Sequence, residues 1–150
     1  EEFLNSYFLK FPEIKEYMNT TIKFCRNSGY VNNMFGRRTY FTGINDKNYN
    51  VRNFQERAAI NAPIQGSASE LMRLAMIRIH NKLSDKKISN AKILLQIHDE
   101  LIFEVKENEV NKLSKIIKEE MTSVKNSEHH SLSVPILVDL NLGDNWGLLH

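Results

Sequence analysis

The stretch QIHDELIFEV, residues 96–105, decides how the second half of the chain folds. Apolar residues that favour strands stand on both sides of the tripeptide His98-Asp99-Glu100. A short polar interruption between two such runs is typical of a β-hairpin. We therefore expect an antiparallel hairpin over residues 93–105, with the tripeptide at its tip.

Period-two alternation along the first strand predicts which side chains share a face. One face would carry Ile93, Leu95 and Ile97. The other face would carry Leu94, Gln96 and His98. Polar side chains would then gather near the tip beside two adjacent carboxylates, which repel each other and are costly to bury unless a cation meets them.

The carboxylates of Asp99 and Glu100 leave two interpretations open. Mg²⁺ takes oxygen ligands and accepts a site with one or two protein carboxylates and substrate phosphates. Such a site would suit phosphoryl transfer with two metal ions. The other interpretation is an ordinary exposed turn, where acidic residues are common.

The first forty residues predict two helices and a small hairpin. Apolar residues at helical spacing predict one helix before Pro12 and a second that starts at Pro12 and ends at Gly29. Residues 30–41 read as two short strands around a turn near Gly36.

Further elements complete an α+β pattern. A helix is expected from Val51 to Asn61 and should stop before Pro63, because the residue before a proline avoids helical geometry. SASE, residues 67–70, fits a capping box that starts another helix. A helix should follow Asn108, and alternating apolar residues over 136–142 predict a strand. The predicted fold is therefore helical first, with a small antiparallel sheet later.

One predicted helix could read a nucleic-acid duplex. Arg57, Asn61 and Gln65 follow one another at intervals of four, which is one helical face up to Pro63. Their donors could reach the minor-groove acceptors that every base pair presents. Neighbouring small residues would permit close approach of the duplex. Read as structure alone, Arg57, Asn61 and Gln65 form a solvated helix face, and the small residues are positions where helices pack.

Composition and charge narrow the class of protein. Hydrophobic residues make up 41% of the 150 residues and charged residues 25%, as in a globular protein with a core, and no run is long enough to span a membrane. The single cysteine, Cys25, excludes a disulfide framework. Residues 1–80 carry eleven Lys and Arg against seven Asp and Glu, including every arginine. A polyanionic partner on that side is consistent with this distribution, as is a solvated basic surface.

Two long stretches together resemble a known family. ERAAINAPIQGSASELMRLAM (residues 56–76) followed by LLQIHDELIFEV (94–105) closely resembles the C-terminal part of the polymerase region in family-A DNA polymerases of the bacterial DNA polymerase I type. GYVNNMFGRRTYF (29–41) and VPILVDLNLGDNW (134–146) look like the same family. The resemblance runs in unbroken order through essentially the whole chain.

The resemblance implies roles for the matched residues. Asp99 and Glu100 would be catalytic residues and ligands of Mg²⁺. The complete enzyme would hold two such ions. The DNA contacts would come from Arg57, Asn61 and Gln65 in the minor groove, from Gln96 and His98 near the primer terminus, and from Arg37 and Arg38 near the backbone. Residues 1–62 would be part of the fingers subdomain. Residues 63–150 would be part of the palm, ending at the natural C-terminus.

The implied activity is that of a DNA-directed DNA polymerase, a nucleotidyltransferase of replication and repair. A primer 3′-hydroxyl would attack the α-phosphate of a deoxynucleoside triphosphate on primer–template DNA. The setting would be the bacterial cytoplasm, in association with the nucleoid, without a membrane or an obligate protein partner. The family's other metal-binding aspartate and its nucleotide-binding fingers helix lie upstream, so we expect a fragment that is inactive alone.

Two alternatives from other classes remain. A non-catalytic nucleic-acid-binding module on a palm scaffold would not need Asp99. A metal-dependent nuclease would need a second acidic cluster on a facing strand, for which the sequence offers only Glu104 and Asp139.

Overall fold

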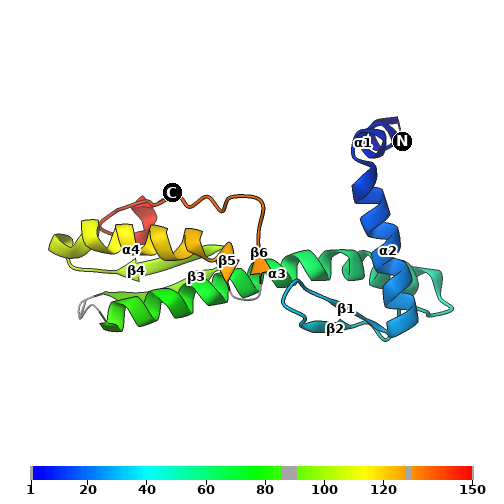
Figure 1. Cartoon of the computed structure of the whole chain (residues 1–150), viewed down its shortest axis with the longest axis horizontal. Helices are drawn as coiled ribbons and strands as arrows, with labels where there is room; N and C mark the ends of the chain where they lie inside the picture. The colour runs from blue at the N-terminus through cyan, green and yellow to red at the C-terminus, as the bar shows by residue number, and fades with distance from the viewer. Residues whose placement is uncertain (1, 86–90, 128–129, 150) are drawn as a thin grey trace. The chain divides into compact units, whose positions relative to one another are not determined.

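The computed structural model describes residues 2–85, 91–127 and 130–149. The chain divides into two compact units, Glu1–Ala68 and Ser69–His150. In chain order the main elements (Figure 1) are α1 (Glu2–Lys10), α2 (Pro12–Ser28), β1 (Tyr30–Asn32), β2 (Arg38–Tyr40), α3 (Tyr49–Asp85), β3 (Lys92–Ile97), β4 (Glu100–Glu104) and α4 (Val110–Ser123). Shorter elements are the 3₁₀ turns η1 (Glu107–Glu109) and η2 (Trp146–Leu148) and the strands β5 (Asn126–Ser127) and β6 (His130–Ser131). The predicted α+β class is confirmed.

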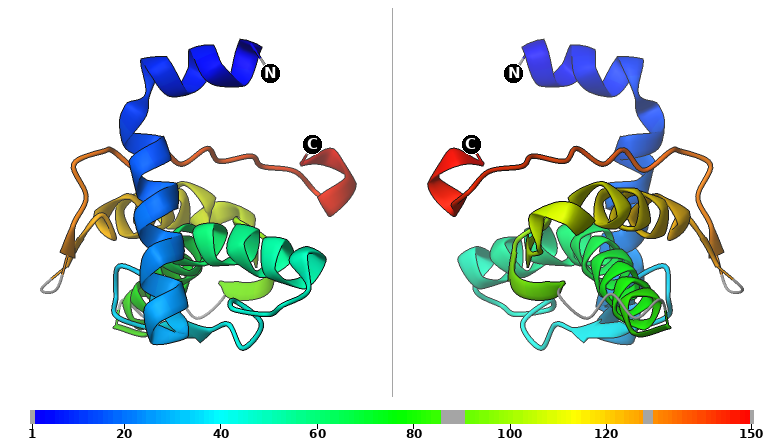
Figure 2. Two further views of the ribbon diagram at one scale, coloured as in Figure 1. Left: turned by 90° about the vertical axis from the view of Figure 1, so that its right-hand side faces the viewer. Right: turned by 90° about the vertical axis from the view of Figure 1, so that its left-hand side faces the viewer.

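Helices α1 and α2 meet at a sharp bend (Figure 2), and their boundaries are those that the sequence predicts. Pro12 opens α2, where its missing N–H costs nothing. Gly29 ends α2 in the left-handed conformation, with φ of 77°, and its N–H donates to the carbonyl of Cys25 at 2.8 Å. The chain then turns directly into β1.

The β1–β2 hairpin packs on the first half of α3. Its strands are antiparallel, with Val31 opposite Thr39, and Gly36 takes a φ of 81° in the turn between them. The core of this unit contains Cys25, Val31, Phe41, Ile44 and Ala59, with Ala58 and Ala62 against it. The alanines therefore bring α3 close to the hairpin, and the helix-packing interpretation of these small residues is confirmed.

Helix α3 does not stop at Pro63, so the predicted break is wrong. It runs unbroken from Tyr49 to Asp85 with the proline inside it. Proline removes one backbone hydrogen bond and crowds the carbonyl four residues earlier, that of Ala59. Tertiary contacts oppose this cost: Ala59 is fully buried, and the Tyr17 hydroxyl donates to the Ile60 carbonyl at 2.9 Å. Packing against α2 and the hairpin overrides the local preference.

The predicted capping box at residues 67–70 is also wrong, because these residues lie within α3. The Ser67 hydroxyl donates to the Pro63 carbonyl at 2.6 Å and accepts from the Met34 N–H at 3.0 Å. Glu70, predicted to reach back to Ser67, forms an ion pair with Arg73. Ser67 therefore joins the helix to the hairpin instead of starting a helix.

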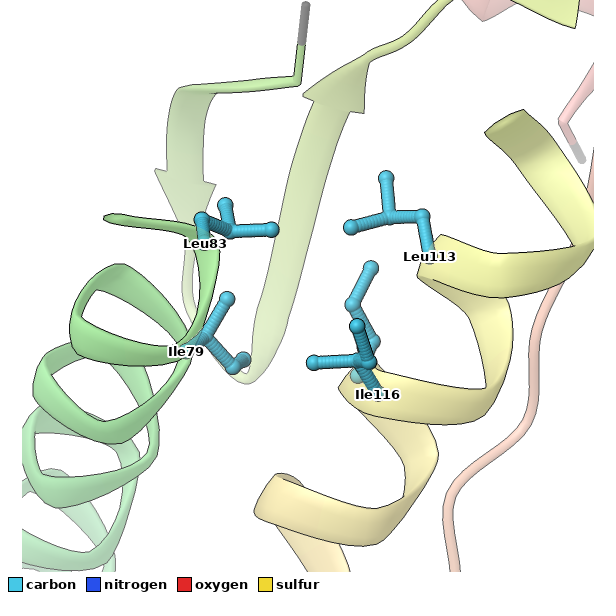
Figure 3. Packing of buried hydrophobic residues seen from close by; sticks show 5 residues of the cluster. Ile79, Leu83, Leu113 and Ile116 are labelled. Carbon is cyan, nitrogen blue, oxygen red and sulfur yellow. The ribbon is translucent and has the colours of Figure 1, made fainter. Parts of the chain in front are cut away.

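In the second unit, α3 and α4 cover one face of the β3–β4 hairpin. Figure 3 shows Ile79 and Leu83 of α3 facing Leu113 and Ile116 of α4. Apolar residues of the hairpin and its flanks complete the cluster: Ala91, Ile93, Leu101, Phe103 and Val105. Burial of these side chains contributes the main driving force for this half of the fold.

A β-bulge at Leu94 overturns the predicted alternation of β3. The register pairs Ile93 with Phe103 but Leu95 with Ile102, so one residue is inserted between the two pairs. Side chains opposite each other share a face, which places Ile93 on the helix-covered face and Leu95 on the other. Gln96 pairs with Leu101 and returns to the covered face near the tip.

Residues 136–142, all of which the structure describes, form no strand. The predicted strand is absent because alternation does not suffice: a strand needs a hydrogen-bonded neighbour. Among the residues of the three described ranges, no helix has the length and apolar character that a membrane span needs.

Candidate catalytic turn and nucleic-acid interface

The hairpin prediction for residues 93–105 is confirmed, and its tip is tight. Ile97 pairs with Glu100, leaving His98 and Asp99 as a two-residue loop. His98 has a φ of 52°, the only positive value among the described residues other than glycine. Residues other than glycine seldom adopt a positive φ, and those that do are concentrated at functional sites. The strained position presents the tripeptide to solvent, since all three of its residues are exposed.

The Gln96 side chain reaches the backbone of the hairpin tip. The Gln96 Nε2 donates to the His98 carbonyl at 3.3 Å. This bond links the end of strand β3 to the backbone of the strained residue. The bulge at Leu94 permits it, because the bulge sets the face on which Gln96 emerges.

The acidic residues at the tip suit a metal site to which other groups also contribute ligands, more than a site built from these residues alone. Asp99 and Glu100 are adjacent and exposed on the rigid hairpin. Across the described ranges, no cluster of three or more His, Cys, Asp or Glu side chains could hold a metal ion. Two carboxylates fit Mg²⁺, which often keeps several waters and binds phosphate oxygens besides one or two protein carboxylates.

Neither acidic candidate for a nuclease site belongs to a cluster of three or more metal-ligating side chains within the described ranges. Glu104 pairs with Lys92 at the opposite end of the hairpin, roughly 13 Å along the strand from Glu100. Asp139 lies in the extended segment that forms no strand. Neither residue supplies the facing acidic cluster that the nuclease alternative requires.

The α3 residues that the sequence predicts to read a duplex form one uninterrupted exposed row. Arg57, Asn61 and Gln65 are all exposed, and the helix that carries them passes through Pro63 without a break. Eight helical steps from Arg57 to Gln65 span about 12 Å, which is comparable to the length of a few base pairs. The sequence pattern predicts one helical face for the first two, up to Pro63, and the structure places Gln65 on the same helix.

The paired arginines lie on the β1–β2 hairpin. Arg37 follows the turn and Arg38 opens β2, and both are exposed. The Arg38 guanidinium carbon lies 4.5 Å from the ring centroid of Tyr30, a cation–π contact. A hydrogen bond with Tyr40 and the electrostatic effect of Tyr30 raise the pKa of Arg38.

Sequence reasoning missed the groups that hold this hairpin in place. Asn33 is a buried polar residue, 8% exposed, with hydrogen bonds to the turn and to α3. An Asn that opens a turn before a glycine is the available signal, because its side chain can bond backbone groups two residues on. The contact to a helix more than thirty positions away leaves no local pattern.

Comparison with known proteins defines the family. The family model for DNA polymerase family A matches residues 1–148. DNA polymerase I of Caldicellulosiruptor bescii is 41% identical over 145 residues, which are 97% of this chain and 16% of that protein. DNA polymerase I of Borreliella burgdorferi is 40% identical over 148 residues, again 16% of its length.

A solved structure agrees. The POL domain of Pol1 from M. smegmatis, in complex with DNA primer-template and dNTP, superposes with a TM-score of 0.89 at 36% identity, covering 97% of this chain and 25% of that one. The chain thus spans about one sixth of the curated relatives it matches. It belongs to DNA polymerase family A.

Proposed function

We propose that this chain is the part of a template-directed DNA polymerase that carries the catalytic turn and a duplex-binding face. The complete enzyme would add deoxynucleotides to a primer 3′-hydroxyl and release pyrophosphate. It would act in replication and repair, in the bacterial cytoplasm near the nucleoid. The observation that carries the proposal is the 0.89 TM-score match to a polymerase domain solved with primer-template and dNTP.

At the catalytic turn, Asp99 and Glu100 would supply carboxylate oxygens to the metal site. Both are exposed at the end of the β3–β4 hairpin, one face of which packs on helices α3 and α4. Mg²⁺ held by these carboxylates would supply activation of the attacking oxygen and stabilisation of the leaving phosphate. The upstream aspartate that the family resemblance implies would complete the set, together with substrate phosphates and water. The hairpin's role is to fix the two carboxylates in position.

On α3, the row of Arg57, Asn61 and Gln65 would hold the newly formed base pairs. Purine N3 and pyrimidine O2 occur in every pair, so donors on this row can bind any correctly paired sequence. Gln96 and His98 would contact the primer terminus. Arg37 and Arg38 would contact the phosphate backbone, where arginine forms bidentate hydrogen bonds.

The subdomain assignment follows from the same proposal. Residues 1–62 would belong to the fingers and residues 63–150 to the palm. The two compact units divide after Ala68, inside α3. Helix α3 would then be the element shared by the two subdomains.

A chimera tests the proposal. Residues of this chain replace the matching 145-residue region of the C. bescii polymerase, to which it is 41% identical. We expect the chimera to extend a primer, and Asp99→Asn to lower kcat about 100-fold or more. Asp144→Asn, an exposed acid in the same unit, is the matched control and should leave kcat unchanged.

The outcomes separate the candidate functions. Full activity of the Asp99→Asn chimera would contradict the catalytic assignment. Duplex binding that is retained without any metal-dependent chemistry would favour the non-catalytic binding module. The 150-residue chain alone should not extend a primer, and extension by the purified chain would overturn that expectation.

A further inference from the structure

Asn33 connects the β1–β2 turn to itself and to α3. Its Oδ1 accepts from the N–H groups of Phe35 and Arg37, at 3.0 and 2.9 Å. Its Nδ2 donates to the Gly66 carbonyl at 3.2 Å. These three bonds pair a polar side chain that is buried where the hairpin meets the helix.

Ser67 makes a second connection beside the first. The Ser67 hydroxyl accepts a hydrogen bond from the Met34 N–H at 3.0 Å and donates one to the Pro63 carbonyl. Helix and turn are close at Gly66, where a Cβ would lie 3.4 Å from the Cβ of Asn33, an ordinary contact distance. Turn and helix are therefore joined at adjacent positions of each.

The joined positions are next to proposed DNA contacts on both sides. Gly66 and Ser67 directly follow Gln65 in α3. The amide of Arg37 is one of the groups that Asn33 binds, and Arg38 follows it. The bonds thus fix the backbone from which the arginines project relative to the row on α3.

We propose that Asn33 and Ser67 form a clamp that holds the Arg37–Arg38 segment beside the duplex-reading row of α3, so that one duplex contacts both. The inference rests on the proposed function. Asn33 is a positioning residue, since its partners are backbone groups. A fixed pair of contact surfaces loses less conformational entropy on binding than two mobile ones.

The test uses the whole chain and a fluorescently labelled primer–template duplex. Dissociation constants are measured by anisotropy at several salt concentrations, at a temperature where circular dichroism shows every variant folded. Asn33→Ala and Ser67→Ala remove one connection each. Ser69→Ala and Asn19→Ala, exposed serine and asparagine residues outside the clamp, are the matched controls. Hydrogen exchange at the Arg37 amide reports on the clamp without DNA.

The expected result has three parts. Each clamp variant weakens binding about three- to tenfold. The slope of log K against log salt falls by about 1, because a phosphate contact is lost. Adding Asn33→Ala to an Arg37→Ala/Arg38→Ala variant changes the affinity less than about twofold, because the asparagine acts through those arginines. The controls keep the wild-type affinity and slope.

Two results would overturn the clamp. Faster exchange at the Arg37 amide in Asn33→Ala, with unchanged affinity and slope, would limit Asn33 to stability. An effect of Asn33→Ala that adds fully to the loss of both arginines would exclude action through them. If the wild-type chain binds no duplex, the proposed function fails and the clamp fails with it, which is distinct from the two results above.

Discussion

Gln96 and His98 are joined across the tip of the β3–β4 hairpin, where the Gln96 side chain donates to the His98 carbonyl at 3.3 Å and His98 holds a φ of 52°. A histidine in this conformation is less stable than a glycine would be. This less stable conformation occurs next to Asp99 and Glu100, to which the family resemblance assigns the catalytic role. The relationship indicates a turn built to present side chains, with stability supplied by the helices beneath it.

Substitution of His98 tests this strain. His98→Gly should keep the free energy of unfolding or raise it by up to about 1 kcal/mol, since glycine takes a positive φ without steric cost. His98→Val should lower it by about 1–2 kcal/mol, because a β-branched side chain is poorly tolerated there. Urea denaturation measures both values. Equal stability of the two variants would show that the turn relaxes and stores no strain.

Pro63 gives a second prediction, at the interior of α3. Pro63→Ala should raise the free energy of unfolding by about 1–3 kcal/mol, because alanine restores a backbone donor toward the Ala59 carbonyl and removes the ring. Thermal unfolding followed at 222 nm measures the change. A less stable Pro63→Ala variant would mean that the contacts of Ala59 and Tyr17 depend on the geometry the proline imposes.

Two substitutions of Gly66 distinguish the effect of helix propensity on stability from the effect of close packing. A methyl group there would meet Asn33 at ordinary contact distance, 3.4 Å. Gly66→Ala should therefore stabilise the chain by up to about 1 kcal/mol. Gly66→Val would press against Asn33 and should destabilise it by about 1–3 kcal/mol. If valine is tolerated as well as alanine when chemical denaturation is measured, the helix and hairpin are less closely joined than the structure indicates.

Cys25 should be unreactive in the folded chain. Its side chain is fully buried, and desolvation raises the pKa of the thiol. The thiolate is the reactive form, so a higher pKa leaves less of it at neutral pH. Labelling by a thiol reagent, followed by absorbance, should be slow in buffer and fast in urea. Rapid stoichiometric labelling without denaturant would contradict the buried position.

Local rules predicted the elements whose signals are local. Pro12, Gly29 and Gly36 each act through their own backbone geometry, and each stands where expected. The hairpin with His98 and Asp99 at its tip follows from the apolar runs on either side. The helix after Asn108 follows from apolar spacing.

The errors share one cause, which is contact between one element and another that the local sequence does not specify. The penalty of Pro63 is outweighed by burial of Ala59 and by a bond from Tyr17. Ser67 matches a capping motif but bonds Met34 of another element. The bulge at Leu94 depends on how β3 aligns with β4, which a single strand does not encode. The alternation over 136–142 specifies a strand only where a neighbouring strand pairs with it.

The most direct measurement is the anisotropy of a labelled primer–template duplex titrated with the chain at several salt concentrations, alongside Arg57→Ala and Gln65→Ala. We expect binding that weakens with salt and weakens by a further factor of about three to ten in each variant. Lys23→Ala, which removes an exposed charge from α2, is the control and should bind like the wild type. A folded chain that binds no duplex, or variants that bind as tightly as the wild type, would contradict the duplex-reading face of α3.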